Sequence, residues 1–175
     1  MKIKRILAGV CAFALLASSV LSLGSCSTGK KDKYVVGISQ LVTHPALDAA
    51  TEGFKKALIE KLGEDKVEFV YQNAANQPDV CATIANGFVS SKVDLIMANG
   101  TAALQAAANA TLDIPILGTS ITEYGVALEI DNFTGTVGGN ISGTSDLAPL
   151  DEQAQMIIDL VPEAKTVGLL YCSAE

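Results

Sequence analysis

The feature that most constrains this chain is the regular alternation of short apolar runs with longer segments of helical periodicity. A continuous apolar run, typical of a strand buried on both faces of a parallel sheet, occupies residues 34–38, and further strands are expected at 67–71, 95–98 and 114–117. Apolar side chains recur at helical spacing over residues 45–62, 78–91 and 101–110, and a short helix is expected at 123–127. This alternation predicts an α/β fold, a doubly wound parallel sheet with strand order 2-1-3-4-5.

The alternation is interrupted by TGTVGGNISGTSD at 134–146, a segment rich in Gly, Ser and Thr. Beyond it we expect one more helix at 150–161 and one more strand at 166–171. A single helix and a single strand cannot bury a core of their own. We therefore assign residues 34–143 to a first ligand-binding lobe and residues 144–175 to a hinge crossing and the start of a second lobe. The chain is interpreted as truncated within that second lobe.

Charge and cysteine usage exclude several classes of function. The formal net charge is −7, which argues against nucleic acid or an anionic lipid surface as the ligand. The cysteines form no C-x-x-C pair, and His44 alone cannot complete a zinc set with them. We interpret Cys81 and Cys172 as free thiols. Since the chain also lacks a dinucleotide motif and a catalytic constellation, we predict no cofactor, no metal and no enzymatic activity.

The first 26 residues are typical of an exported lipoprotein. Three basic side chains precede a mostly apolar run at 6–23, which is the layout of a secretory signal and is short for a permanent span. The letters LGSC at 23–26 resemble a lipobox, which predicts cleavage after residue 25 and a diacylglycerol thioether on Cys26. Residues 26–33 are then the lipidated cysteine and its tether. Acyl chains such as palmitate would hold the protein on the extracytoplasmic face of the cell membrane.

The same stretch has a second interpretation, because GSCSTGKK at 24–31 nearly matches a phosphate-binding P-loop. Such a loop follows a buried strand and places Ser or Thr after its lysine to hold Mg²⁺. Here a signal-type run precedes the loop, and Lys31 stands at the Ser/Thr position. We therefore reject nucleotide binding by this stretch.

Polar residues follow each predicted strand, where ligands bind in doubly wound sheets. The pair Gly100 and Thr101 comes between an apolar strand and a helix, and the free N–H groups of that helix suit a carboxylate. Ordinary N-capping by Thr101 or Asn99 is an equal alternative. For Asn73 and Gln40, turn or loop roles compete evenly with binding. His44 is interpreted as a residue packed against the first turn of the helix that follows it.

Five stretches, in this order, carry a resemblance to a known family: VGISQLVTHPALDAATEGFKKAL at 36–58, VYQNAANQPD at 70–79, DLIMANGTAALQAA at 94–107, GGNISGTSDLAP at 138–149 and LVPEAKTVGLLYCSAE at 160–175. They resemble the ABC transporter substrate-binding lipoproteins that include tryptophan and tyrosine uptake proteins. The letters HPALD at 44–48 are the most specific part of the match.

The resemblance implies a periplasmic-binding-protein-like fold of type I with two lobes. It also implies a small-molecule ligand in the cleft between them, an amino acid with aromatic ones among the candidates. The partners implied are an ABC permease and its ATPase. Asp146 is implied to lie near the hinge. Carried over by position, the residues implied to face the cleft are Gln40, Asn73, Asn99, Thr101, Thr119 and Ser120.

Two stretches depart from the family pattern. Residues 119–122 (TSIT) replace a T-D-P-like turn, and residues 75–77 (ANQ) replace a Gly-acid pair. Both are expected at the cleft, so the ligand need not be tryptophan. A ligand-sensing lipoprotein module coupled to a signalling receptor is the alternative function. An enzyme on the same kind of sheet is disfavoured, because export is predicted and no catalytic set is found.

Overall fold

The computed structural model describes residues 32–170 and contains one parallel sheet of five strands. The strands are β1 (Tyr34–Gln40), β2 (Val67–Asn73), β3 (Leu95–Asn99), β4 (Ile116–Ile121) and β5 (Ile141–Ser145). Their order across the sheet is β2-β1-β3-β4-β5, and every neighbouring pair is parallel. The predicted fold class and strand order are therefore confirmed.

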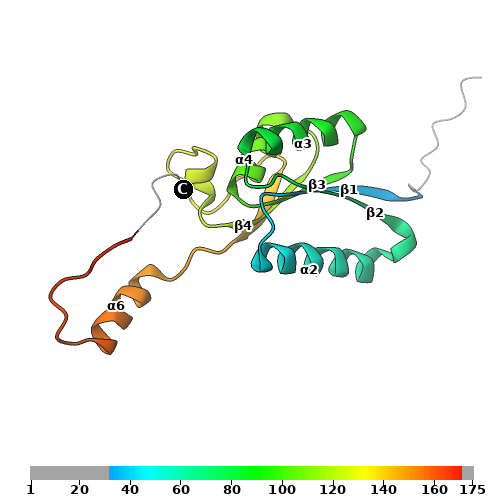
Figure 1. Ribbon diagram of the computed structural model, residues 1–175. Coiled ribbons are helices and arrows are strands. Elements are labelled where there is room, and N and C mark those ends of the chain that lie inside the picture. Colours follow the sequence, from blue (N-terminus) through cyan, green and yellow to red (C-terminus); the bar gives the residue numbers. More distant parts are fainter. Residues whose placement is uncertain (1–31, 171–175) are drawn as a thin grey trace, which may run out of the picture. The chain divides into compact units, whose positions relative to one another are not determined.

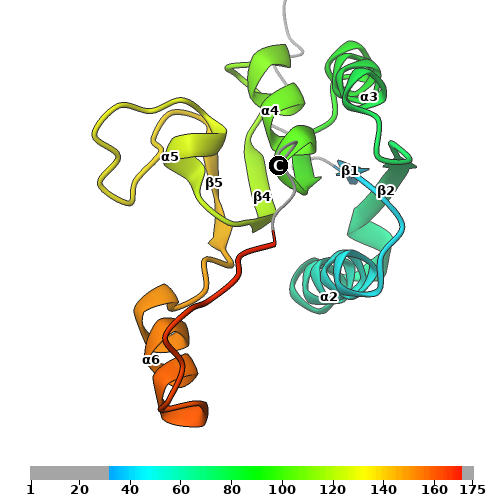
Figure 2. The same cartoon turned by 60° about the vertical axis from the view of Figure 1, so that its left-hand side comes forward.

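Helices cover both faces of the sheet (Figure 1). The helices of the described residues are α2 (Pro45–Leu62), α3 (Pro78–Ser91), α4 (Thr101–Ala110), α5 (Tyr124–Ala127) and α6 (Leu150–Leu160), with a 3₁₀ turn, η1, at Glu64–Lys66. Of these, α6 does not cover the sheet. Figures 1 and 2 show α2 on one face of the sheet and α3 and α4 on the other. A layer of helices on each side is what buries strands that are apolar on both faces.

Local signals set the bounds of α2, which agree with the predicted helix at 45–62. Pro45 occupies the first turn, where its missing N–H costs nothing. His44 is the N-cap, and its Nδ1 accepts a hydrogen bond from the Ala46 N–H at 3.2 Å. Gly63 ends the helix at φ 96°. The prediction that His44 is a helix-entry residue packed against the first turn is confirmed.

The core has two parts, one on each face of the sheet. On the α2 face, Val36, Ile38 and Met97 pack against Phe54 and Leu58. On the opposite face a larger cluster joins the sheet to α3, α4 and α5, with the following members among its fully buried side chains: Cys81, Phe88, Ile96, Leu104 and Ile116. The sheet is thus fixed from both sides, which holds the ends of its strands in place.

Two predicted segments differ from the structure. β5 was not predicted as a strand, and it lies in the Gly-, Ser- and Thr-rich segment at 134–146. Conversely, residues 166–170 form no strand, so the prediction at 166–171 is wrong for its described part. A strand needs a ladder partner, and none of the five described strands pairs with this segment. The lobe boundary placed after residue 143 stays a prediction, although β5 continues to Ser145.

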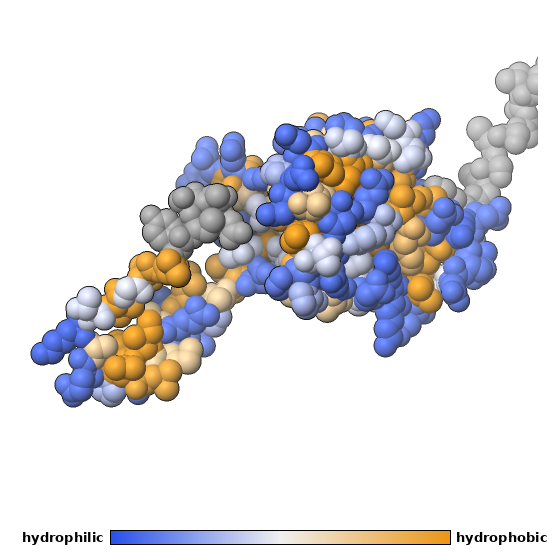
Figure 3. Space-filling view, in the orientation of Figure 1, coloured by the Kyte–Doolittle hydropathy of each residue, from blue (hydrophilic) through white to orange (hydrophobic). Residues whose placement is uncertain are grey.

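The helix α6 follows the sheet and keeps its apolar side chains in solvent. Met156, Ile157 and Ile158 are 50%, 41% and 59% exposed, and Figure 3 shows apolar surface over this helix. The predicted helix at 150–161 is confirmed as Leu150–Leu160. Within residues 32–170, none of the helices has the length and the apolar composition that crossing a bilayer requires.

Candidate functional site

The candidate site is the edge of the sheet at which the strands end. Because all five strands are parallel, their carboxyl ends meet at this one edge. Gln40, Asn99 and Ser120 lie at or next to the ends of β1, β3 and β4, which are neighbours in the sheet. The topology therefore brings together three residues that are up to 80 positions apart in the sequence.

Gln40 is fully buried at this edge and turned toward α2. Its Nε2 donates to the carbonyl oxygen of Val42 at 2.9 Å and to Oδ1 of Asp48 at 2.6 Å. Its Oε1 accepts from the hydroxyl of Thr51 at 2.7 Å. All hydrogen bonds of this amide thus go to the chain itself, and they tie the end of β1 to the first turns of α2.

Asn99 is also fully buried and continues the same set of hydrogen bonds. Its Nδ2 donates to Thr51 Oγ1 at 3.0 Å and to the carbonyl oxygen of Leu47 at 2.8 Å. Its Oδ1 accepts from the hydroxyl of Ser120 at 2.8 Å. The two predicted amides therefore lie beneath the edge, and they reach its surface through Ser120, which is half-buried.

Thr51 is the member of this hydrogen-bond network that sequence reasoning missed. It is 2% exposed and stands between the two amides, with hydrogen bonds to both Gln40 and Asn99. A signal was present, because Thr51 occurs among the apolar residues of the helix face that packs on the sheet. A buried hydroxyl at such a position needs polar partners, and the strand ends supply them.

The N-terminus of α4 presents free backbone N–H groups beside this network. Gly100 is the cap, at φ 108°, and it brings no side chain that could accept from the first turn. Thr101 is exposed at the first position of the helix. The expected alternative, capping by the side chain of Thr101 or Asn99, is therefore not what the structure has. The amide of Gly100 itself donates to the carbonyl oxygen of Thr119 at 3.0 Å.

Asn73 has a turn role at the end of β2. Its Oδ1 accepts from the Ala75 N–H at 2.8 Å, which forms a local turn. Its Nδ2 donates to the hydroxyls of Thr43 and Tyr71 at 3.2 Å and 3.1 Å. These contacts place Asn73 at the same edge of the sheet as the network, but at its outer strand.

The end of β4 holds the other predicted residues. The hydroxyls of Thr119 and Thr144 are 3.3 Å apart, which joins β4 to β5. Ser120 has a left-handed backbone, φ 56°, at the point where the pairing of β4 with β5 shifts register. Asp146 follows β5 in an exposed position, and its N–H donates to the Ile121 carbonyl oxygen at 3.0 Å. The hinge role of Asp146 stays a prediction.

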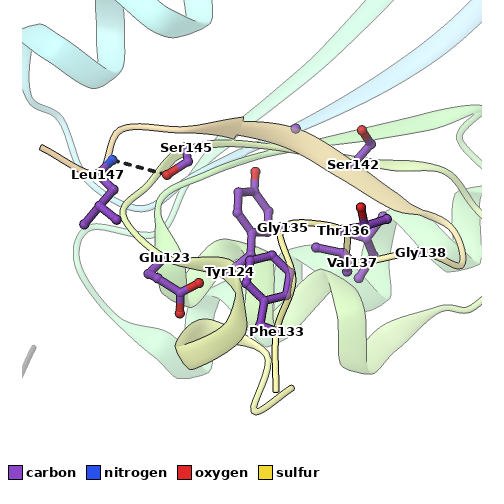
Figure 4. Close-up of a pocket in the computed structure, with 12 residues that line it drawn as sticks. Glu123, Tyr124, Phe133, Gly135, Thr136, Val137, Gly138, Ser142, Ser145 and Leu147 are labelled. Carbon is purple, nitrogen blue, oxygen red and sulfur yellow. Dashed lines mark hydrogen bonds between the residues drawn. The ribbon is translucent and has the colours of Figure 1, made fainter. Parts of the chain in front are cut away.

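A cavity of about 590 Å³ lies beside β5 and α5, away from the network. Figure 4 shows Tyr124 and Phe133 side by side in it, and the hydroxyl of Tyr124 donates to the Thr144 carbonyl oxygen at 3.3 Å. None of the six residues implied to face the cleft lines this cavity. We place the candidate site at the strand ends instead, because ligands of doubly wound sheets bind beyond the carboxyl ends of the strands.

Two ionisable side chains of the core have shifted pKa values. Burial raises the pKa of the Cys81 thiol, which is fully buried and free. Burial also raises the pKa of the Tyr124 hydroxyl, and the nearby Asp146 carboxylate raises it further. Both groups are therefore neutral at physiological pH. The predicted lipidation site, Cys26, and the second predicted free thiol, Cys172, lie outside the described residues.

Comparison with known proteins agrees with this architecture. The model of a family described as ABC transporter substrate binding protein matches residues 35–175. The tyrosine-binding protein of Clostridioides difficile (strain R20291) is 40% identical over 181 residues, an alignment that covers 97% of this chain and 51% of that protein. The chain therefore spans about half the length of this relative.

Solved structures give the same picture. A domain from Streptococcus pneumoniae, in complex with L-Trp, is 33% identical with a TM-score of 0.74, over 82% of this chain and 48% of that one. A ligand-free, open substrate-binding protein with adhesive properties from Clostridium difficile is 41% identical with a TM-score of 0.67, over 81% of this chain and 48% of that one. Since the family model covers most of the chain, the protein belongs to the ABC transporter substrate-binding protein family.

Proposed function

We propose that this chain forms one wall of an amino-acid-binding cleft in the extracytoplasmic component of an ABC importer. The observation that carries the proposal is the open N-terminus of α4 beside the buried network of Gln40, Thr51 and Asn99. An N-terminus of this kind attracts a carboxylate, through its N–H groups and the positive end of the helix dipole. The fully bonded network beneath it keeps the wall rigid.

In this proposal the ligand carboxylate accepts hydrogen bonds from the first-turn N–H groups of α4 and from the Thr101 hydroxyl. Thr101 is exposed at that position, and Gly100 has no side chain to accept hydrogen bonds from the first-turn N–H groups in place of a ligand. Neutral polar groups at the strand ends complete the wall. The ligand is expected to be bound and released unchanged, because the site offers hydrogen bonds and no nucleophile paired with a base.

An aromatic amino acid is the ligand we favour. The relatives that support this choice are a tyrosine-binding protein and a domain in complex with L-Trp. Both share a third or more of their aligned residues with this chain. The TSIT sequence at 119–122, which departs from the family pattern, lies at the site, so we do not choose between tyrosine and tryptophan.

The setting we propose is the outer surface of the cell membrane. A diacylglycerol group on Cys26 would anchor the protein there, and the loaded protein would deliver its ligand to an ABC permease driven by an ATPase. The family match supports the importer role. The lipobox at 23–26 supports the anchor.

The binding proposal is tested by NMR titration of the chain with L-tyrosine and with L-tryptophan. We expect shifts at the amides of Thr101 and Ala102 at millimolar ligand, because one wall of a cleft binds weakly. Thr101→Val should weaken binding about fivefold, through the loss of one hydrogen bond. Thr83→Val is the matched control, since the Thr83 hydroxyl bonds only its own helix, at the Asp79 carbonyl oxygen.

The proposal fails if none of the twenty amino acids perturbs the first turn of α4. It also fails if Thr83→Val weakens binding as much as Thr101→Val does. Perturbation by small carboxylates such as acetate, and equally by every amino acid, would show an anion site without selectivity and would contradict the amino-acid assignment.

A further inference from the structure

The hydrogen bonds that run from Asp48 to Ser120 have one possible direction. At the end of the network on α2, Gln40 Nε2 faces a carboxylate oxygen of Asp48 and the carbonyl oxygen of Val42. Both of these groups only accept hydrogen bonds. The amide of Gln40 cannot be turned around without placing its oxygen against two acceptors, so Oε1 must face Thr51.

The hydrogen bond from Thr51 to Gln40 also determines which atom donates between Thr51 and Asn99. A hydroxyl has a single hydrogen, and Thr51 gives it to Gln40 Oε1 at 2.7 Å. Toward Asn99, therefore, Thr51 can only accept, and it accepts from Nδ2 at 3.0 Å. The carbonyl oxygen of Leu47, 2.8 Å from the same nitrogen, accepts the other hydrogen of this amide, so the two acceptors hold the orientation of Asn99 together.

The direction ends at Ser120. With its nitrogen facing α2, Asn99 has only Oδ1 to offer on the other side, and this oxygen accepts the hydrogen of Ser120 at 2.8 Å. The hydroxyl hydrogen of Ser120 is thus used in the hydrogen bond to Asn99 and is not available to a ligand. A hydroxyl oxygen that donates its hydrogen keeps lone pairs that can accept, and Ser120 is half-buried at the candidate site.

We propose that Ser120 acts toward the ligand as a hydrogen-bond acceptor only, and that Thr51 is a positioning residue that, together with the Leu47 carbonyl oxygen, holds Asn99 in the orientation that fixes this polarity. The proposal rests on the proposed function, which it deepens by naming the ligand group that Ser120 recognises. An acceptor at this position selects a ligand that presents N–H donors, such as the ammonium group of an amino acid. It disfavours a ligand with only acceptors there.

Burial makes the polarity stable. Gln40 and Asn99 are 0% exposed and Thr51 is 2% exposed, so water does not reach the network to replace a lost partner. Reversal of any one member would set two acceptors or two donors against each other inside the protein. Thr51 contributes through Asn99 and not by contact with the ligand, because α2 buries its side chain.

The test compares two ligands that differ only in the ammonium group, L-tryptophan and indole-3-propionate, each titrated into the chain by NMR. The unaltered chain should bind L-tryptophan at least about tenfold more tightly, through the charge-assisted bond. Thr51→Val keeps the volume but can neither donate nor accept. It should weaken the binding of L-tryptophan about tenfold and the binding of indole-3-propionate less than about twofold.

Two further variants serve as controls. Thr51→Ser keeps the hydroxyl and should restore the preference for L-tryptophan. Thr83→Val makes the same change on α3 and should alter neither affinity. If Thr51→Val lowered the affinity for both ligands equally, Thr51 would have a structural role only and the proposal would be overturned. An unchanged preference for L-tryptophan in Thr51→Val would also overturn it.

A second measurement needs neither a variant nor a ligand. In the unaltered chain, the side-chain amide protons of Asn99 should show nuclear Overhauser contacts to Thr51. Closer contacts from these protons to Ser120 would mean a reversed amide and would overturn the proposal. If neither compound binds the unaltered chain, the proposed function fails at this site, and the Overhauser contacts alone decide the polarity of Ser120.

Discussion

At the scale of single residues, Gly100 holds a position that requires glycine. Its backbone has φ 108°, which residues other than glycine rarely adopt, and an added Cβ would lie 2.9 Å from Leu41 Cβ. The turn it forms joins β3 to α4 and so places the first-turn N–H groups of the candidate site.

Gly100→Ala should therefore destabilise the chain by about 1–3 kcal/mol, from strain at a left-handed position. The measurement is the free energy of unfolding in urea. Gly87→Ala is the matched control, because a Cβ there meets nothing within 4 Å and Gly87 lies inside α3. It should stabilise the chain by about 0.5–1 kcal/mol. Equal effects of the two substitutions would contradict the role given to Gly100.

For the polar residues of the site, the sequence predicts their position in the fold but not the orientation of their side chains. Their position at strand ends was predictable, because the apolar runs that precede Gln40 and Asn99 are plain. Which way each side chain points was not. Gln40 turns inward because α2 brings Asp48 and Thr51 against it, and those contacts depend on how the helix packs on the sheet. Whether these residues serve a ligand stays a prediction.

At the scale of elements, helices were more predictable than strands. The predicted helices at 45–62, 78–91 and 101–110 have the same bounds in the structure, since proline or glycine marks their starts. β5 escaped prediction because Ser142, Gly143 and Thr144 lack the apolar character of a central strand. As an edge strand, β5 is held by its ladder with β4 and is largely exposed.

The contact between α5 and β5 predicts a pH dependence at this edge of the sheet. The Tyr124 side chain is 5% exposed, and its hydroxyl donates to the Thr144 carbonyl oxygen. Burial raises the pKa of this hydroxyl in the folded chain above its value in the unfolded chain, and the Asp146 carboxylate raises it further. The hydroxyl therefore loses its proton more readily when the chain unfolds.

The stability that Tyr124 contributes is complete below about pH 10, the ordinary pKa of tyrosine, and is lost as pH rises through the folded-state pKa. The free energy of unfolding should fall there by at most about 1.4 kcal/mol per pH unit for this one group. In Tyr124→Phe this part of the decline should be absent. Cys81 contributes equally to both proteins, so identical pH profiles would contradict the assignment to Tyr124.

At the scale of the whole molecule, attachment to a membrane is predicted to depend on one atom, the sulfur of Cys26. Each buried CH₂ of an acyl chain contributes about 0.8 kcal/mol, and two or three chains suffice for stable anchoring. Cys26→Ser should therefore move the protein from the membrane fraction to the soluble extracytoplasmic fraction. Cell fractionation with mass spectrometry of the N-terminal peptide measures both location and lipid.

Cys172→Ser is the matched control, because it removes a thiol outside the lipobox and should leave the protein in the membrane fraction. Retention of Cys26→Ser in the membrane after cleavage of the signal peptide would contradict the anchor. Within residues 32–170 no helix can take the place of such an anchor by spanning the bilayer.

The order of the strands has a consequence for how the chain is assembled in time. β1 is synthesised first and lies inside the sheet, where β2 and then β3 pair with its two sides. β4 next pairs with β3, and β5 with β4. Each new strand thus meets a partner that has already been made, so the sheet can grow outward without waiting for later residues. Growth in this order shortens the time for which the growing edge of the sheet lacks its next strand. It therefore limits wrong pairing between nascent chains at that edge.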